Sequence, residues 1–264
     1  MKKRLNVFLL TDMEGVAGID SIDDMDRESE RFSLSRKKLC AEINLAVDAC
    51  FEGGADRVYY LDGHAGGGNV IESLIDPCAL KCSLADWQTL LATGEIDCQI
   101  ELGAHARPGT VGGFLDHTLS SRTIYSVKIN AREMSEFALH AMLCAKYKVP
   151  IVAVTGDEVA CMQAREYVHD VFVGAVKRAS CRNVALTYPN AESIIRKTIL
   201  QALAKYNEVS LIPFTEPLTV EYTYYRTDMC EDALANCKTE VQRPDARTLC
   251  KVSPTLSCYA DLKI

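Results

Sequence analysis

Two carboxylates stand two residues apart near the start of the chain, directly after an apolar run. Residues 5–10 are apolar and are predicted to form a buried strand, which leads to Asp12 and Glu14. If the extended geometry persists, side chains at positions i and i+2 point to one face, so the two carboxylates converge at the strand's end. Two anions held this close repel each other unless a cation lies between them. The pair therefore indicates a metal site, with two solvated surface acids as the alternative.

Further metal-binding side chains follow the next predicted strands. The strand at residues 57–61 is followed by Asp62 and His64, and the strand at 98–102 leads to His105. Ligands of open α/β sheets bind outside the carboxyl ends of the strands, so these side chains are candidates for one pocket. Either histidine alone is more simply a surface or hydrogen-bonded residue, but with the acidic pair they favour metal binding. Mixed histidine and carboxylate donors suit zinc, manganese or iron, and a bridging carboxylate favours two metals about 3.5–4 Å apart.

Six short motifs occur in a fixed order over residues 5–180: Asp12-Met13-Glu14-Gly15, Gly63-His64, Gly103-Ala104-His105-Ala106-Arg107, Asp116-His117-Thr118, Ile129-Asn130 with Glu136, and Thr155-Gly156-Asp157. Together they resemble the motifs of the zinc-dependent D-aminopeptidases of the DppA type. The combination of the first three motifs is the most specific part of this resemblance.

The resemblance implies a ligand set and a reaction. The residues that match the family's ligands for two zinc ions per subunit are Asp12, Glu14, His64, His105 and Glu136, of which Asp12 matches the bridging aspartate. His117 matches a further histidine that is implicated in catalysis. The implied reaction is removal of N-terminal residues, D-amino acids by resemblance alone, from short peptides or amino-acid amides. Family members form rings, often decamers, so a homo-oligomer is implied as well.

Four further polar residues are predicted to support the site. Asp62, Asn130 and Asp157 are expected to orient the ligands. Arg107 is expected to anchor a loop or a substrate carboxylate, with an exposed structural role as the alternative.

Strands and helices alternate along the chain, which predicts an α/β fold with a mostly parallel sheet flanked by helices. Two more strands are expected at residues 123–129 and 150–154. A helix is expected from Ser33 or Ser35 to about residue 53, and others at residues 130–148 and 190–206. Asn130 is predicted to cap the second of these, with Glu133 completing a capping box. Its residues Glu133, Glu136 and His140 would share one helical face. His140 is expected to pack or form a hydrogen bond, and His169 to be structural or exposed.

The C-terminal part of the chain has a different pattern. Residues 218–225 alternate and are rich in β-branched and aromatic side chains, which predicts a strand. A short helix at residues 229–234 and weak strand signals near residue 264 complete a smaller α+β subdomain. The predicted division is therefore a catalytic domain at residues 1–210 and a subdomain at 211–264, with Pro213 and Pro217 at the hinge.

Composition is that of an ordinary globular protein, with 264 residues, 48% hydrophobic and 25% charged. The formal net charge of −7 gives no electrostatic case for binding nucleic acid or an anionic membrane. The start Met1-Lys2-Lys3-Arg4 precedes an apolar run that is too short for a signal peptide, which favours a cytoplasmic protein. The twelve cysteines form no C-x-x-C pair, and most are expected to be small buried hydrophobic residues, among them Cys40, Cys50, Cys144 and Cys161.

The leading hypothesis is a two-metal aminopeptidase that acts on a small peptide. One alternative is a metallohydrolase of a non-peptide amide or a phosphoester, although a phosphatase would need more cations than Arg107. The other is a metal-dependent binding protein without turnover.

Overall fold

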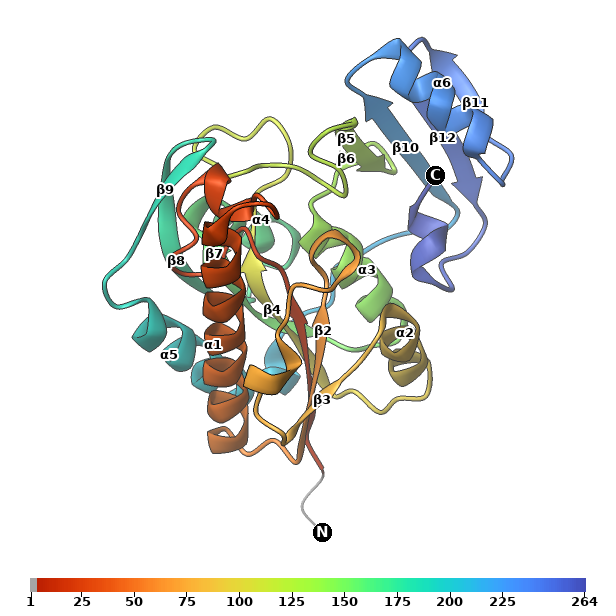
Figure 1. Cartoon of the computed structure of the whole chain (residues 1–264). Coiled ribbons are helices and arrows are strands. Elements are labelled where there is room, and N and C mark those ends of the chain that lie inside the picture. The colour runs from red at the N-terminus through yellow and green to blue at the C-terminus, as the bar shows by residue number, and fades with distance from the viewer. Residues whose placement is uncertain (1–3) are drawn as a thin grey trace.

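Seven strands form the larger of two sheets in the computed structural model, which describes residues 4–264 (Figure 1). Their order is β3-β2-β1-β4-β7-β8-β9, and every pairing is parallel except that of β8 with β9. The strands are β1 (Asn6–Thr11), β2 (Arg57–Asp62), β3 (Ala79–Lys81), β4 (Cys98–Ala104), β7 (Ile151–Asp157), β8 (Phe172–Cys181) and β9 (Val184–Thr187). The predicted α/β fold with a mostly parallel sheet is confirmed.

Helices cover both faces of this sheet, as a parallel sheet requires. On one face, α1 (Glu30–Glu52) packs against α5 (Ala191–Ala204). The opposite face carries α2 (Leu84–Ala92), α3 (Glu136–Lys146) and α4 (Glu158–Tyr167). Within residues 4–264, none of the helices combines the length and the apolar composition that a membrane crossing requires.

One tryptophan lies at the centre of the core between α2 and the larger sheet. Trp87 of α2 is fully buried, and its ring centroid lies 6.1 Å from that of Phe8 in β1. Its indole nitrogen donates a 2.8 Å hydrogen bond to Gln99 Oε1 in β4. A buried indole that finds an acceptor in this way adds both apolar area and a fixed orientation. This contact ties α2 to the two central strands.

Five antiparallel strands form a second sheet at one end of the molecule, in the order β11-β12-β10-β5-β6 (Figure 1). They are β5 (Ile124–Ile129), β6 (Arg132–Glu133), β10 (Leu218–Tyr224), β11 (Gln242–Asp245) and β12 (Thr248–Ser253), and α6 (Thr227–Asn236) packs on them. The strand and short helix predicted around residues 218–234 are confirmed. The second sheet also includes residues 124–133 from the middle of the chain, and the division at residue 210 stays a prediction.

Two details of the predicted elements are wrong. Helix α1 begins at Glu30 with Ser29 as its N-cap, so Ser35 lies inside the helix, where its hydroxyl donates to Arg31 O. The weak strand signals near residue 264 correspond to a 3₁₀ turn, η5 (Tyr259–Leu262). Of the basic start at Met1–Arg4, residues 1–3 lie outside the described part of the chain.

Asn130 does not cap a helix. Asn130 and Ala131 have φ angles of +49° and +65°, and they connect β5 to β6 where Ile129 pairs with Arg132. A two-residue hairpin of this type needs positive φ at both central positions, and asparagine tolerates that conformation well. Glu133 therefore lies in β6, and α3 begins at Glu136 with Ser135 as its N-cap. The predicted face shared by Glu133, Glu136 and His140 does not exist.

The cap at Ser135 can be tested by the sign of one substitution. The Ser135 side chain accepts a hydrogen bond from Ala138 N at 3.3 Å, so Ser135→Ala should lower the free energy of unfolding by about 1 kcal/mol. If the helix instead began near Asn130, Ser135 would lie in its interior and alanine would stabilise by a few tenths of a kcal/mol. Urea unfolding of the two proteins distinguishes a loss from a gain.

All twelve cysteines are free in the described part of the chain. Those expected to be buried, Cys40, Cys50, Cys144 and Cys161, are buried. Burial raises the pKa of the Cys161 thiol to about 12, and it raises the pKa values of Cys50 and Cys144 as well. These side chains are therefore protonated, apolar components of the core.

Candidate metal centre

The candidate site lies at the carboxyl ends of β1 and β4, which are neighbours at the centre of the larger sheet. Connections leave these two strands toward opposite edges of the sheet, and ligands of such sheets bind at this switch point. Asp12 follows β1 and His105 follows β4, as predicted. The extended geometry assumed for Glu14 is wrong, because β1 ends at Thr11 and the chain turns back, with Val16 N donating to Met13 O. This turn nevertheless brings Glu14 beside Asp12.

Two glycines allow the ends of β1 and β4 to approach each other. Gly15 N donates a 2.8 Å hydrogen bond to Gly103 O. A Cβ atom on Gly15 would lie 2.3 Å from Ala104 O, and one on Gly103, whose φ is +70°, would lie 2.1 Å from Asp12 O. Since side chains cannot be placed at such distances, both motifs need glycine at these positions.

One group of donors is formed by Asp12, Glu14 and His64. Nδ1 of His64 lies 3.0 Å from Asp12 Oδ1 and 3.0 Å from Glu14 Oε2. The three ligand atoms lie within 4.8 Å of one another, which is the spacing of donors around one ion.

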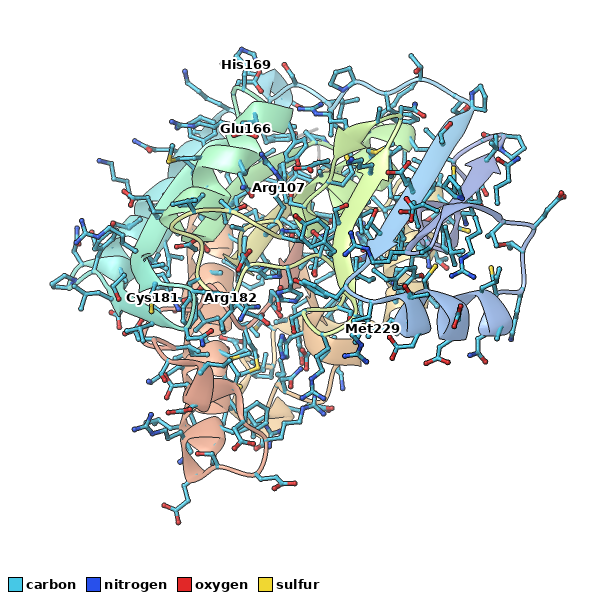
Figure 2. All side chains as sticks on the ribbon, turned by 90° about the horizontal axis from the view of Figure 1, so that it is seen from above. Arg107, Glu166, His169, Cys181, Arg182 and Met229 are labelled. Atoms are coloured by element: carbon cyan, nitrogen blue, oxygen red, sulfur yellow. The ribbon has the colours of Figure 1, made fainter. Side chains whose placement is uncertain are left out.

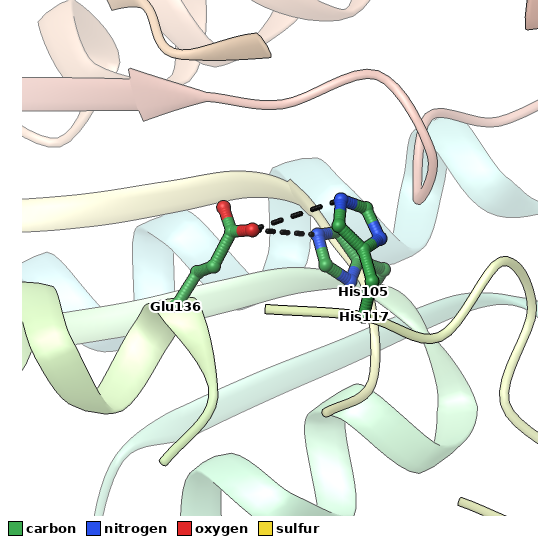
Figure 3. A group of neighbouring side chains, drawn as sticks. All are labelled: His105, His117 and Glu136. Atoms are coloured by element: carbon green, nitrogen blue, oxygen red, sulfur yellow. Dashed lines mark ion pairs between the residues drawn. The ribbon is translucent and has the colours of Figure 1, made fainter. Parts of the chain in front are cut away.

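A second group is formed by His105, His117 and Glu136 (Figure 3). Glu136 Oε1 lies 3.5 Å from His105 Nε2 and 3.7 Å from His117 Nε2, and the two imidazoles stack with centroids 4.0 Å apart. Nδ1 of His105 faces Ala106 O at 3.1 Å, and Nδ1 of His117 faces Leu115 O at 2.8 Å. Donation from each Nδ1–H leaves the Nε2 lone pair of each ring directed into the site.

Asp12 joins the two groups. Its Oδ1 contacts His64 of the first group, and its Oδ2 lies 3.2 Å from His105 Nε2 of the second. This Nε2 atom is buried, yet it makes no hydrogen bond of acceptable geometry. A buried ring nitrogen without a hydrogen-bond partner, surrounded by carboxylate oxygens, is the arrangement expected of a metal ligand. The donor set therefore fits two metal ions that share Asp12.

Comparison with known proteins shows the family to which the chain belongs. A family model described as D-aminopeptidase matches residues 5–260. The chain belongs to the D-aminopeptidase family. It is 26% identical over 232 residues, 84% of this chain and 82% of its relative, to a D-aminopeptidase of Bacillus subtilis (strain 168). The predicted family and the assignment to the aminopeptidases, which are hydrolases, are thus confirmed.

A solved structure has the same fold as this family member. It is described as the Zn-dependent D-aminopeptidase DppA from Bacillus subtilis, a self-compartmentalizing protease. The TM-score is 0.88 at 21% sequence identity, over 98% of this chain and 95% of the other.

In the centre of this D-aminopeptidase family member, the positive charges of the imidazoles partly offset the negative charges of the carboxylates. Burial disfavours the ionised form of Glu136, but the positive charge of His105 outweighs it and lowers the pKa of Glu136 to about 2. Burial also opposes protonation of His64, whereas the charge of Glu14 and hydrogen bonds that His64 donates to both carboxylates raise its pKa to about 11. The charge of Glu136 likewise raises the pKa of His105 well above its usual value against the effect of burial. The metal-free centre therefore holds protons on these imidazoles at neutral pH.

Asp62 organises the loop that carries His64. Its carboxylate accepts hydrogen bonds from Asn69 N at 2.7 Å and from Val70 N at 3.0 Å. Asn69 Nδ2 in turn donates to His64 O at 2.7 Å. Asp62 thus contacts the polypeptide around His64, and its role in orienting a ligand stays a prediction.

Three predicted supporting residues lie away from the donor groups. Arg107 pairs with Glu166 of α4 at 2.9 Å, and Figure 2 shows the two side by side. Asn130 bridges the β5–β6 turn to Thr215 O and Thr219 N. Asp157 is fully buried at the end of β7, and burial raises its pKa to about 6. None of the three lines the cavity above the donor groups.

The other two histidines lie as expected. His140 is buried and hydrogen-bonds to Glu101 at 3.1 Å. His169 is exposed at the surface, 3.9 Å from Asp170 (Figure 2).

A buried lysine that sequence reasoning missed supports the Glu14 loop. Lys177 of β8 is fully buried and donates to Glu14 O at 2.8 Å and to Ile19 O. Burial lowers its pKa to about 8, and the opposing charges of Asp20 and Glu42 keep it above neutral pH. The ammonium is therefore mostly charged, and it holds two carbonyls of the loop that carries Glu14. The available signal was a lysine that directly follows the apolar run at residues 171–176.

Metal binding should release protons, because a metal needs the lone pairs of His64 and His105 while the free protein holds protons there. The affinity for zinc should therefore rise with pH until the pKa of His64, about 11, is reached, and fall on acidification. Calorimetric titration with zinc chloride in two buffers of different ionisation enthalpy measures the release, with about one proton expected per imidazole. A pH-independent affinity without proton release would contradict this charge balance.

Lys177→Met should loosen the Glu14 loop by leaving two buried carbonyls unpaired. We expect the free energy of unfolding to fall by about 2–4 kcal/mol and the zinc affinity to weaken. The control is Arg178→Met, which removes an exposed cation from the next position of the same strand. Urea unfolding and zinc titration of both variants compare the two, and equal behaviour would exclude a supporting role for Lys177.

Proposed function

We propose that this chain is a binuclear zinc aminopeptidase that removes N-terminal D-amino acids from short peptides or amino-acid amides. The observation that carries the proposal is the shared position of Asp12 between two donor groups. The names of its relatives support zinc and D-specificity, since one is a D-aminopeptidase and the other is Zn-dependent.

The proposed ligands are Asp12, Glu14, His64, His105 and Glu136. Three carboxylates and two imidazoles suit zinc in chemical type, and Asp12 has an oxygen directed to each group. When bound, two zinc ions supply a nucleophile at neutral pH and polarise the scissile carbonyl. The Asp12 and Glu14 carboxylates stay ionised in this site, because nearby imidazoles lower their pKa values against the effects of burial.

His117 is proposed to move protons during the reaction. Its Nδ1 is held by Leu115 O, so Nε2 faces Glu136 Oε1 at 3.7 Å and Glu14 Oε1 at 3.9 Å. The ring also lines the cavity in which a substrate would lie. An imidazole in this position can hold a proton at Nε2 and deliver it to the leaving amine.

We also propose a cytoplasmic homo-oligomer, with the decamer implied by the resemblance as its form. The support is the description of the structural relative as self-compartmentalizing. The mass in solution, measured by light scattering, tests this, and a monomer would refute it.

Metal content and substrate preference test the proposed function. The purified, untagged protein should contain about two zinc ions per chain, and Asp12→Ala should lose most of both because it removes the shared carboxylate. The zinc-loaded protein should hydrolyse D-alaninamide faster than L-alaninamide. Absence of stoichiometric metal after reconstitution would refute the binuclear site.

His117→Ala should keep the zinc and lose about 10²–10⁴-fold in kcat, as expected for removal of a proton-transfer group. The exposed His169 provides the control, because His169→Ala should change neither quantity. If His117→Ala loses zinc, His117 is a ligand rather than a proton carrier.

A further inference from the structure

The C-terminal segment forms part of the wall of the cavity above the metal centre. This cavity has a volume of about 1340 Å³ and is lined by Glu14, His64 and Glu136 as well as by Tyr259 and Lys263. The 3₁₀ turn η5 that contains Tyr259 packs against α3, which begins at Glu136 (Figure 1). Two residues of this C-terminal segment therefore line the same cavity as the donor groups.

Tyr259 is held firmly in this wall. Its side chain is buried, and its hydroxyl lies 3.2 Å from His140 Nε2, whose Nδ1 faces Glu101. The tyrosine ring makes an edge contact with Trp87 at 6.0 Å. A buried and fully connected network of this kind fixes side-chain positions.

The backbone after Tyr259 is fixed as well. Tyr222 of β10 donates to Leu262 O at 3.0 Å, and Lys251 of β12 donates to Ala260 O at 3.0 Å. The second sheet thus holds two residues of the turn itself, and Lys263 follows directly from this anchored segment.

Lys263 is a partly buried cation without a carboxylate partner. Its Nζ lies 4.5 Å from the centroid of the Tyr259 ring, and no ion pair within 4 Å joins it to any of residues 4–264. Burial lowers the pKa of Lys263, whereas the negative charge of Glu136 opposes this shift. The Lys263 ammonium is therefore attracted electrostatically to Glu136. An ammonium held over an aromatic face and taken partly out of water is well placed to bind an anion.

The other four cations around the cavity are already engaged or exposed to solvent. Lys81 pairs with Glu72, and Arg182 pairs with Asp116 at 2.8 Å. Arg27 and Arg122 are exposed at the surface, where solvent weakens their attraction for an anion. Lys263 is therefore the cation best suited to recognise a charge on a bound substrate.

A short peptide offers one anion that fits this position. If the zinc ions receive the N-terminal amine and the scissile carbonyl, the remaining charge of an unsubstituted dipeptide is its C-terminal α-carboxylate. We propose that Lys263 binds the C-terminal α-carboxylate of the substrate and so makes the site selective for short peptides with a free carboxylate over the corresponding amides. This inference rests on the proposed aminopeptidase function.

A matched pair of substrates tests the inference. The zinc-loaded wild-type protein should hydrolyse D-alanyl-glycine with a higher kcat/KM than D-alanyl-glycinamide. Lys263→Met should lower kcat/KM for the free acid by about tenfold, the size of one charge-assisted hydrogen bond, and leave the amide nearly unchanged. Lys263→Arg should keep part of the preference, since it keeps the charge. Lys81→Met, which removes a cation of the same cavity that is already paired, should keep all of it.

Two outcomes separate the inference from the function on which it rests. Equal kcat/KM for acid and amide in the wild type, or an equal loss for both in Lys263→Met, overturns the role of Lys263 while the aminopeptidase stands. If the zinc-loaded wild type hydrolyses neither compound, the proposed function fails, and calorimetric binding of the same two compounds then decides the inference. Tighter binding of the acid that disappears in Lys263→Met supports it, and equal binding overturns it.

Discussion

Three carboxylates that converge on one small volume impose the main physical constraint on this molecule. Glu14 is buried and Asp12 and Glu136 are partly buried beside it, where their mutual repulsion is large unless positive charge lies among them. The imidazoles of His64 and His105 supply that charge in the free protein. Metal ions can replace these protons, because they bind the same lone pairs and also carry positive charge. The approach of β1 to β4 through Gly15 and Gly103, and the buried ammonium of Lys177, both hold the carboxylates in place against this repulsion.

The two donor groups draw on both sheets of the molecule, since His105 of the second group follows β4 of the larger sheet. Asp12, Glu14 and His64 follow adjacent parallel strands of the larger sheet, which a rigid ladder of hydrogen bonds holds in register. His117 and Glu136 flank the β5–β6 hairpin, which belongs to the second sheet through the pairing of β5 with β10. The second sheet therefore contributes to the candidate site. It supports one side of the metal centre and, through the turn at Tyr259, one wall of the cavity.

Much of this candidate site could be predicted from the sequence, because the carboxyl ends of parallel strands lie at the same edge of the sheet. Asp12, His64 and His105 could be located from apolar runs alone, and the resemblance added Glu136 and His117. Asn130 was misread because Asn-Ala-Arg-Glu satisfies a capping pattern as well as a hairpin turn, and only the pairing of β5 with β6 decides between them. Lys177 contacts a loop more than a hundred residues away, and Lys263 lines a cavity together with residues equally distant in the sequence, so no local pattern reports either placement. Local periodicity thus gave the elements, whereas tertiary contacts determined their supporting residues.

The twelve unpaired cysteines affect how zinc would act on the stability of this protein. In the native state most of the core thiols are protonated and inaccessible, so they do not compete with the imidazoles and carboxylates for the metal. Denaturation exposes them at ordinary pKa values, and thiolates are among the strongest zinc ligands in proteins. A metal that binds the unfolded chain stabilises the native state by less than its affinity for the native site would imply. Zinc would therefore act both as a ligand of the folded enzyme and as a trap for its unfolded form, with the balance set by the concentration of free metal.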